Sequence, residues 1–466
     1  MLTYFPKYIS FLAIIAYIIT LAIVNVVFNE QVLPLQFIAF GLFFVTSFFA
    51  LSHKITVSWV KKTNRSFIRM IFWTALVVRI FYVIIIYFYY IYNTGQPHAF
   101  GSADELFYVS MGALWRDYGI DTFKDQLKAS VSFSDSGYCW WLAFENLIFG
   151  TGVLIPRLIK CLIDAFTCVL VYNLAKRNFE DTTARMAAIF CMLMPNFWYY
   201  CGVTLKETEM AFLVVLFVER ADYFLRQPKF RVKDWILPVL IAFVLFTFRT
   251  ALAAVLVMAL VCAIIFGQGR QLATWKKVTY SLFFIVIMML VVRVEIVQEV
   301  QEIWVGSGDQ SKGLEWRAER EGGNAFAKYA GAAVFAPIIF TIPFPTMVDI
   351  PMQENQMMLN GANYIKNIMS GFTIFALFLL LFRKEWRKHV LPLAVMGGYL
   401  VVLVFSNFAQ SERFHFPALP FELMFAAYGI SQLKAKHRTW FNIWIVFVCI
   451  AIVGWSWFKL AGRGMV

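Results

Sequence analysis

Long apolar runs separated by short polar stretches make up most of the chain. The runs are roughly 17 to 25 residues long, which is the length that an α-helix needs to cross the hydrocarbon core of a membrane. About thirteen of them are predicted to span, at residues 8–28, 33–52, 66–93, 153–174, 184–201, 207–224, 235–250, 251–267, 278–293, 364–382, 390–408, 415–431 and 440–459. This pattern predicts an all-α polytopic membrane protein.

Composition agrees with this pattern. The 466 residues are 61% hydrophobic and 18% aromatic, with a mean hydropathy of +0.69, which is too apolar for a soluble protein of this size. The first apolar run is longer than a signal-peptide core and lacks a small-residue cleavage site, so we expect a retained helix. The seven cysteines lie mostly in predicted helices without CxxC spacing, which is typical of buried apolar positions.

The net charge of +13 indicates topology rather than nucleic-acid binding. The basic residues form six clusters in short loops, at 54–65, 176–185, 226–233, 270–277, 383–388 and 434–438. If the N-terminus is cytoplasmic, all six clusters fall on the cytoplasmic side and the C-terminus lies outside.

This topology divides the chain into five regions with two large extracytoplasmic loops. They are N-terminal transmembrane helices at 1–93, a first outer loop with interfacial helices and an acidic pair at 94–152, central transmembrane helices at 153–293, a second outer loop at 294–363, and C-terminal transmembrane helices at 364–466. Within the second loop, residues 331–346 are apolar. A further span there would move the basic cluster at 383–388 outside, so we expect an interfacial or re-entrant segment.

An acidic stretch directly follows the third apolar run, with the sequence FGSADELFYVSMGALW over residues 100–115. The spacing of Ser102 and Glu105 predicts a capping box at the start of an interfacial helix, with Asp104 in its first turn. One apolar stripe is expected on this helix: Phe107, Met111, Leu114 and Tyr118. Capping does not require Asp104, which the helix dipole would keep ionised and able to accept a proton.

Basic residues gather at the same outer level of the membrane. They stand at the ends of predicted segments: Arg157, Lys206, Arg249 and Arg413, with Glu207 and His415 beside two of them. Each alone is explained as a snorkelling or interfacial residue. Together they suit an anionic group, and phosphate is the obvious candidate because guanidinium and ammonium groups neutralise it.

Three more charged residues lie deeper in the predicted segments. Lys160 and Asp164 are four residues apart in the fourth segment and are expected to pair with each other. Arg79, near the middle of the third segment, has no predicted partner. The chain has no zinc-ligand spacing, P-loop or GxGxxG motif, and its five histidines give no basis for a Ser–His–Asp triad.

Three stretches resemble the GT-C class of glycosyltransferases (families 39 and 83), polytopic enzymes that take a sugar from a polyprenyl-phosphate donor. The stretches are SADELFYVSMGALW, the block from GTGVLIPRLIK to TLKETEMAFLVV, and ERFHFPALPFELMFAAYGI. The middle block is the most specific, because R-L-I-K, A-K-R-N-F, the helix break at Pro195 and L-K-E-T occur in the order that such proteins show. The resemblance covers residues 95–265 and 410–430.

The resemblance implies a catalytic base at the acidic pair, Asp104 with Glu105 as partner or alternate. It also implies that outer basic residues bind the donor phosphate: Lys206, Arg249, Arg157 and Arg413. Further site candidates are Glu207, His415 and Tyr108. Many members have two separated acidic motifs that can bind Mg or Mn, and this chain shows no clear second one, so its metal ligands are unknown and no cofactor is certain.

The implied function is inverting sugar transfer from a polyprenyl-phosphate donor to an extracytoplasmic lipid, glycan or protein acceptor. The expected place is the inner (plasma) membrane, with membrane lipids and no nucleic acid as partners. One alternative is an O-antigen polymerase or ligase that uses a lipid-diphosphate donor and is centred on Arg317 and Arg320. The other is a lipid-linked sugar transporter or flippase, although such proteins usually carry internal repeats with sites at the midplane.

Overall fold

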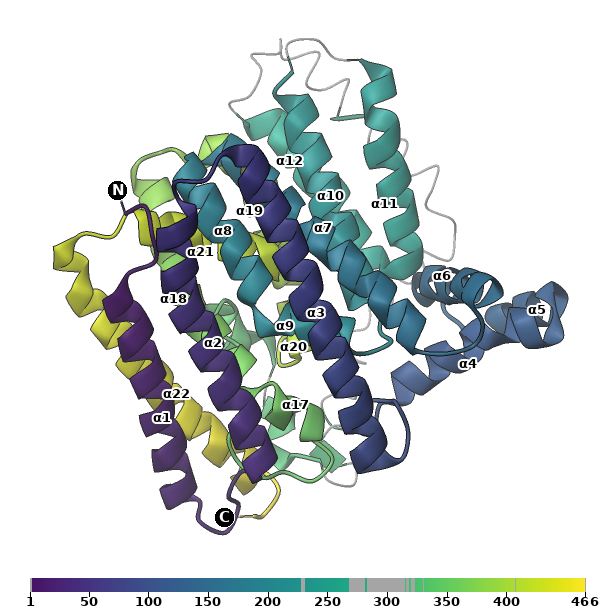
Figure 1. Ribbon diagram of the computed structural model, residues 1–466, viewed down its shortest axis with the longest axis horizontal. Helices are drawn as coiled ribbons and strands as arrows, with labels where there is room; N and C mark the ends of the chain where they lie inside the picture. The colour runs from purple at the N-terminus through teal and green to yellow at the C-terminus, as the bar shows by residue number, and fades with distance from the viewer. Residues whose placement is uncertain are drawn as a thin grey trace.

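A computed structural model describes residues 2–227, 231–267, 281–282, 315, 318–319, 323–329, 331–406 and 408–465. Over these residues the protein is built almost entirely of helices, and one isolated antiparallel bridge joins Val32 to Val348. The two termini lie at opposite ends of the bundle (Figure 1). The all-α prediction is therefore confirmed for the described part of the chain.

Three long apolar helices begin the chain: α1 (Lys7–Val27), α2 (Leu35–Trp59) and α3 (Asn64–Thr94). The start of α3 is capped by Thr63, whose side chain accepts a hydrogen bond from the Ser66 N–H at 3.4 Å. Its end is set by Gly95, whose φ of 71° is a conformation that favours glycine. The chain thus leaves α3 directly before the acidic stretch.

The first predicted outer loop consists of three helices: α4 (Ala103–Tyr118), α5 (Ile120–Ser130) and α6 (Phe133–Phe149). They extend from one side of the bundle, at the right of Figure 1. Helix α4 packs on α6, and α6 packs on α11 of the central group. These contacts hold the acidic start of α4 against the bundle.

The central helices are α7 (Leu154–Asn178), α8 (Asp181–Leu193), α9 (Pro195–Cys201), α10 (Glu207–Leu225), η1 (Val232–Trp235), α11 (Ile236–Phe248) and α12 (Thr250–Phe266). Pro195 separates α8 from α9, because the residue before a proline avoids helical geometry and Met194 is extended. Arg249, also extended, separates α11 from α12. The break at Arg249 agrees with the predicted boundary between two segments, whereas the break at Pro195, which the resemblance implied, divides the single span predicted at 184–201.

The remaining elements are η2 (Ala325–Tyr329), α16 (Ala332–Phe335), η3 (Ala336–Ile338), α17 (Glu354–Met358), α18 (Asn360–Phe382), η4 (Trp386–His389), α19 (Val390–Phe405), α20 (Glu412–His415), α21 (Leu419–Ser431), η5 (Ala435–His437) and α22 (Arg438–Ala461). Residues 331–346 contain only short helical pieces followed by irregular chain. This agrees with the prediction that they form no spanning helix.

Six described helices are long and apolar enough to cross a membrane: Lys7–Val27, Leu35–Trp59, Asn64–Thr94, Asn360–Phe382, Trp386–Phe405 and Ala435–Ala461. Thr250–Phe266 and Leu419–Ser431 are shorter apolar helices. Most of the predicted span at 278–293 lies outside the described residues, as do Arg317 and Arg320. The protein is thus a polytopic membrane protein, while the count of about 13 spans stays a prediction.

A buried ion pair joins two of the packed helices and corrects a prediction. Arg79 of α3 donates through Nε to Asp164 of α7, and both side chains are buried. Lys160 instead donates to the carbonyls of Val203 and Leu205, and its Nζ lies 3.6 Å from Glu209. The predicted Lys160–Asp164 pair was wrong, because Asp164 faces α3, where Arg79 needs an anion.

Candidate active site

Three charged residues that are far apart in sequence meet at one point. Arg413 of α20 donates through Nη1 to Asp104 of α4 and through Nε to Glu207 at the start of α10. The Glu207 side chain is buried, whereas that of Asp104 is 61% exposed. One arginine therefore joins an accessible carboxylate of α4 to a buried carboxylate at the start of α10.

His415 anchors the short helix that carries Arg413 and lies away from the cluster. Its Nδ1 is 2.8 Å from the ammonium nitrogen of Lys366, and its Nε2 is 2.8 Å from the carbonyl oxygen of Ala409. Because an ammonium group only donates, Nδ1 accepts and the Nε2–H donates. Both ring nitrogens are thus used within the protein.

Lys206 lies next to this cluster and is held by a residue that the sequence analysis missed. Its ammonium donates to the Asp135 carboxylate and to the carbonyls of Ser134 and Phe248. The Tyr108 hydroxyl donates to the same carboxylate at 2.8 Å. Asp135 lies in the first turn of α6, in the SFSDSG segment of the predicted outer loop. Its place in that loop was the only feature of the sequence that pointed to a role in the site.

The pKa values of this pair follow from burial and charge. Burial raises the pKa of Asp135, but the Lys206 ammonium and the surrounding donors outweigh it and hold that pKa below its usual range. Burial and the nearby Arg249 guanidinium lower the pKa of Lys206 to about 8. Lys206 is therefore charged at pH 7 but titrates close to it.

Arg249 is the cation of this group that has no carboxylate partner among the residues the structure describes. Its guanidinium carbon lies 4.3 Å from the centre of the Phe414 ring, and Nη1 donates to the Tyr399 hydroxyl at 3.4 Å. Phe414 directly follows Arg413, so this cation lies beside the Asp104 cluster. An unneutralised guanidinium suits an anionic ligand.

Glu105 faces away from its neighbour Asp104 and is fully buried. Its Oε1 lies 2.8 Å from Nη2 of Arg157 and accepts the Thr204 N–H at 2.6 Å, while its Oε2 accepts the Ala99 N–H at 2.9 Å. The predicted capping box was wrong: the Ser102 side chain makes no cap bond. The Arg157 guanidinium binds the carboxylate more strongly than a local backbone group would.

The apolar face of α4 also differs from the predicted stripe. The residues buried on it are Glu105, Tyr108, Met111 and Gly112, whereas Phe107 is 36% and Tyr118 71% exposed. The reason is close packing on α6, because a Cβ on Gly112 would lie 2.8 Å from the Leu142 side chain. Helix α4 is therefore turned so that Glu105 and Tyr108 point inward.

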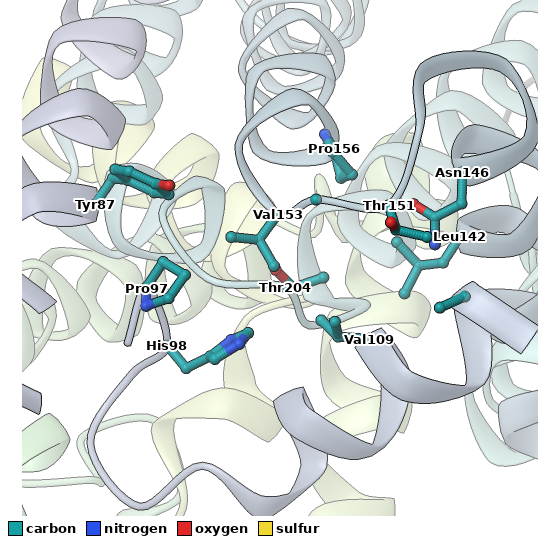
Figure 2. A pocket seen from close by; sticks show the side chains of 12 residues that line it. Tyr87, Pro97, His98, Val109, Leu142, Asn146, Thr151, Val153, Pro156 and Thr204 are labelled. Atoms are coloured by element: carbon teal, nitrogen blue, oxygen red, sulfur yellow. The ribbon is translucent and has the colours of Figure 1, made fainter. Parts of the chain in front are cut away.

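Figure 2 shows a cavity of about 300 Å³ whose lining includes Pro97 and Thr204, which are hydrogen-bonded to Arg157 and Glu105, respectively. Twelve residues line it: Tyr87, Pro97, His98, Val109, Ala113, Leu142, Asn146, Thr151, Gly152, Val153, Pro156 and Thr204. Nδ1 of His98 and Nη1 of Arg157 are buried without a hydrogen-bond partner among the described residues. Asp104 and Arg413 are not among the lining residues.

The candidate residues thus fall into two groups, one around Asp104 of α4 and the other around its neighbour Glu105. Asp104, Glu207 and Arg413 form one cluster, and Lys206, Tyr108 and Arg249 adjoin it. Glu105 and Arg157 form the second group. Within the described part of the chain, no three His, Cys, Asp or Glu residues are grouped so that they could hold a metal ion, and the carboxylates of both groups are paired with cations.

Comparison with known protein families bears on this arrangement. Residues 137–295, about a third of the chain, match the family model described as dolichyl-phosphate-mannose-protein mannosyltransferase. The match supports a GT-C class glycosyltransferase. It includes α7 to α12 and hence Arg157, Lys206 and Arg249. Neither a curated protein nor a solved structure matched the chain.

The Glu105 carboxylate is expected to stabilise the fold. Burial raises its pKa, but His98, Arg157 and the backbone donors lower it to about 2 from an ordinary value of 4.5. Its stabilisation is thus present above pH 4.5 and lost as the pH falls toward 2. Glu105→Gln should reduce stability by about 3 kcal/mol at pH 7, measured by thermal unfolding in detergent, because it leaves Arg157 buried without an anion.

Glu180→Gln, at a carboxylate just before α8, is the control and should unfold like the wild type. Equal stability of the Glu105→Gln and wild-type proteins at pH 7 would contradict a structural role for the pair.

Proposed function

We propose that the protein transfers a sugar from a polyprenyl-phosphate donor to an acceptor on the extracytoplasmic side of the plasma membrane. The observation that carries this proposal is the exposed carboxylate of Asp104, fixed by Arg413 and lying beside the unneutralised guanidinium of Arg249. The family match supports the class of reaction, and the arrangement supplies a base and an anion site for it.

Asp104 is the proposed base. As the acceptor hydroxyl oxygen forms a bond to the anomeric carbon, Asp104 takes the hydroxyl proton. The bond between the anomeric carbon and the phosphate oxygen breaks, and its electron pair leaves with the polyprenyl phosphate. A phosphate is a good leaving group, so no general acid is required, and a single displacement inverts the anomeric carbon.

The cations then have different roles. Arg249 holds the donor phosphate and stabilises the charge that grows on it, and Lys206, whose three hydrogen bonds are made within the protein, adds its charge nearby. Arg413 is a positioning residue, because it is held between Asp104 and Glu207. Arg157 orients α4 through Glu105 rather than contacting the phosphate. Asp104 is preferred over Glu105 because only Asp104 is accessible to an acceptor.

The test is donor cleavage by purified protein in nanodiscs. Polyprenyl-phosphate sugars and lipid-diphosphate sugars are added separately, with and without candidate acceptors and with Mg or Mn, and the free polyprenyl phosphate or diphosphate is measured. Release from at least one polyprenyl-phosphate sugar supports the proposal. Release only from lipid-diphosphate sugars would favour a polymerase or ligase, and movement of a lipid-linked sugar without a covalent product would favour a flippase.

Donor affinity is expected to fall as the pH rises through about 8. Lys206 has a pKa of about 8, so it loses the charge that attracts the phosphate above that pH. The measurement is the dissociation constant of polyprenyl phosphate between pH 6.5 and 9.5. Lys206→Arg should flatten this dependence because arginine stays protonated, and an unchanged slope in that variant would assign the titration to another group.

A further inference from the structure

A second cleft, which we call the α22 cleft, lies beside the candidate site and has two different halves. Its polar half encloses about 290 Å³, and its lining includes Gln353, Gln356, Ser411, Phe414 and Lys459. Its apolar half encloses about 440 Å³, and its lining includes Val334, Phe344, Gly454 and Trp457. Trp455 and Phe458 line both halves, so the two halves adjoin at these side chains.

The polar half contains a buried ammonium group. Lys459 donates to the Thr346 hydroxyl and to the carboxamide oxygens of Gln353 and Gln356, at 2.8 and 2.7 Å for the two amides. All three acceptors are neutral, and no carboxylate of the described residues lies within ion-pair distance of Lys459. The charges of Glu412 and Arg463 also act on this ammonium, but no described carboxylate contacts it, and a buried cation without a contacting anion favours an anionic ligand. The remaining amide and hydroxyl groups of this half suit a ligand rich in hydroxyls.

The apolar half suits a hydrocarbon chain. Its walls are aromatic and aliphatic side chains of α22 and of the segment from η2 to Phe344. Trp457 and Val334 at its edge are half-exposed, and α22 belongs to a helix long and apolar enough to cross the membrane. A chain in this groove could continue into the lipid.

We propose that the α22 cleft binds the acceptor as a lipid with an anionic, hydroxylated head. This proposal rests on the proposed function, because Ser411 and Phe414 of the polar half flank Arg413, which holds Asp104. Phe414 also contacts Arg249, which is assigned to the donor phosphate, and lines the head-binding half of the cleft, so that two lipids can be held next to each other.

The chain offers a matched pair of variants for the test. Gly454 lines the apolar half, and a Cβ there would meet nothing within 4 Å, so Gly454→Phe fills the groove without a clash at its base. Gly397 of α19 is equally open and lines neither half of the cleft, so Gly397→Phe is the control. Native mass spectrometry in detergent would count bound phosphatidylglycerol, an anionic hydroxylated probe, against phosphatidylcholine with the same chains.

We expect Gly397→Phe to bind one phosphatidylglycerol as the wild type does, and Gly454→Phe to lose at least tenfold in that binding. Lys459→Met should remove most of the preference for phosphatidylglycerol over phosphatidylcholine. Unchanged binding by Gly454→Phe, or equal binding of the two lipids by the wild type, would overturn the proposal.

Polyprenyl-phosphate binding separates this proposal from the proposed function. Gly454→Phe should retain it, because the donor phosphate is assigned to Arg249 and the nearby charge of Lys206. Loss of that binding in Gly454→Phe would assign the groove to the donor chain and overturn the acceptor proposal. Absence of polyprenyl-phosphate binding in the wild type would instead count against the proposed function. The phosphatidylglycerol measurement would then still decide whether the cleft binds an anionic lipid.

Discussion

Asp104→Asn is expected to reduce sugar transfer by about 10²- to 10⁴-fold, the range typical of a lost general base. Asparagine has nearly the same shape and can still contact Arg413, but it cannot take the proton of the acceptor hydroxyl. The measurement is the rate of product formation with a donor that the wild type cleaves. Because Asp104 is largely exposed, the variant should unfold at nearly the wild-type temperature.

Asp121→Asn is the matched control, since Asp121 is an exposed carboxylate in the first turn of α5, in the same outer region. It should retain wild-type activity. Polyprenyl-phosphate binding should persist in Asp104→Asn, which separates loss of the base from loss of the donor site. A wild-type rate of transfer by the Asp104→Asn protein would mean that Asp104 contacts Arg413 but is not the base.

Arg249→Gln is expected to reduce the rate of transfer by about 10²-fold, the effect of losing one fixed group that stabilises developing charge. Its guanidinium is the one in the cluster that no described carboxylate neutralises, so its loss removes attraction to the phosphate directly. Steady-state kinetics would separate a fall in kcat from a rise in KM. Arg249→Lys should recover part of the activity, because it keeps the charge but not the planar group stacked on Phe414.

Arg387→Gln, at an exposed cation between α18 and α19, is the control for the change in net charge and should leave both constants unchanged. An Arg249→Gln protein with wild-type kcat and KM would move the phosphate site to other cations. An equal loss in both variants would indicate a general effect of charge.

The helices and their breaks were largely readable from the sequence, because apolar length and the positions of Pro195 and Arg249 are local features. The number of membrane crossings was not, since short helices such as α11 and α12 form adjacent apolar elements whose depth depends on packing. The partner of Arg79 was missed for the same reason. Asp164 was predicted to pair with Lys160 of its own helix, but its side chain faces α3 and pairs with Arg79.

The site was predictable as a set of residues but not as a geometry. Sequence reasoning gathered Asp104, Glu207 and Arg413 at one level, and the structure joins them directly. It could not separate Asp104 from Glu105, because adjacent residues on a helix point about 100° apart and the inward side depends on the contact of α4 with α6. Asp135 was missed because a single aspartate at a helix start resembles ordinary capping.

The Arg79–Asp164 pair also bears on how the protein enters the membrane. An arginine near the centre of a helix costs about 2.5–3.5 kcal/mol on insertion scales, and its anion is synthesised 85 residues later. Arg79 can therefore gain this counter-charge only after α7 has been synthesised. We therefore expect the insertion of α3 and α7 to be coupled through this pair, and α7 is also the helix that carries Arg157.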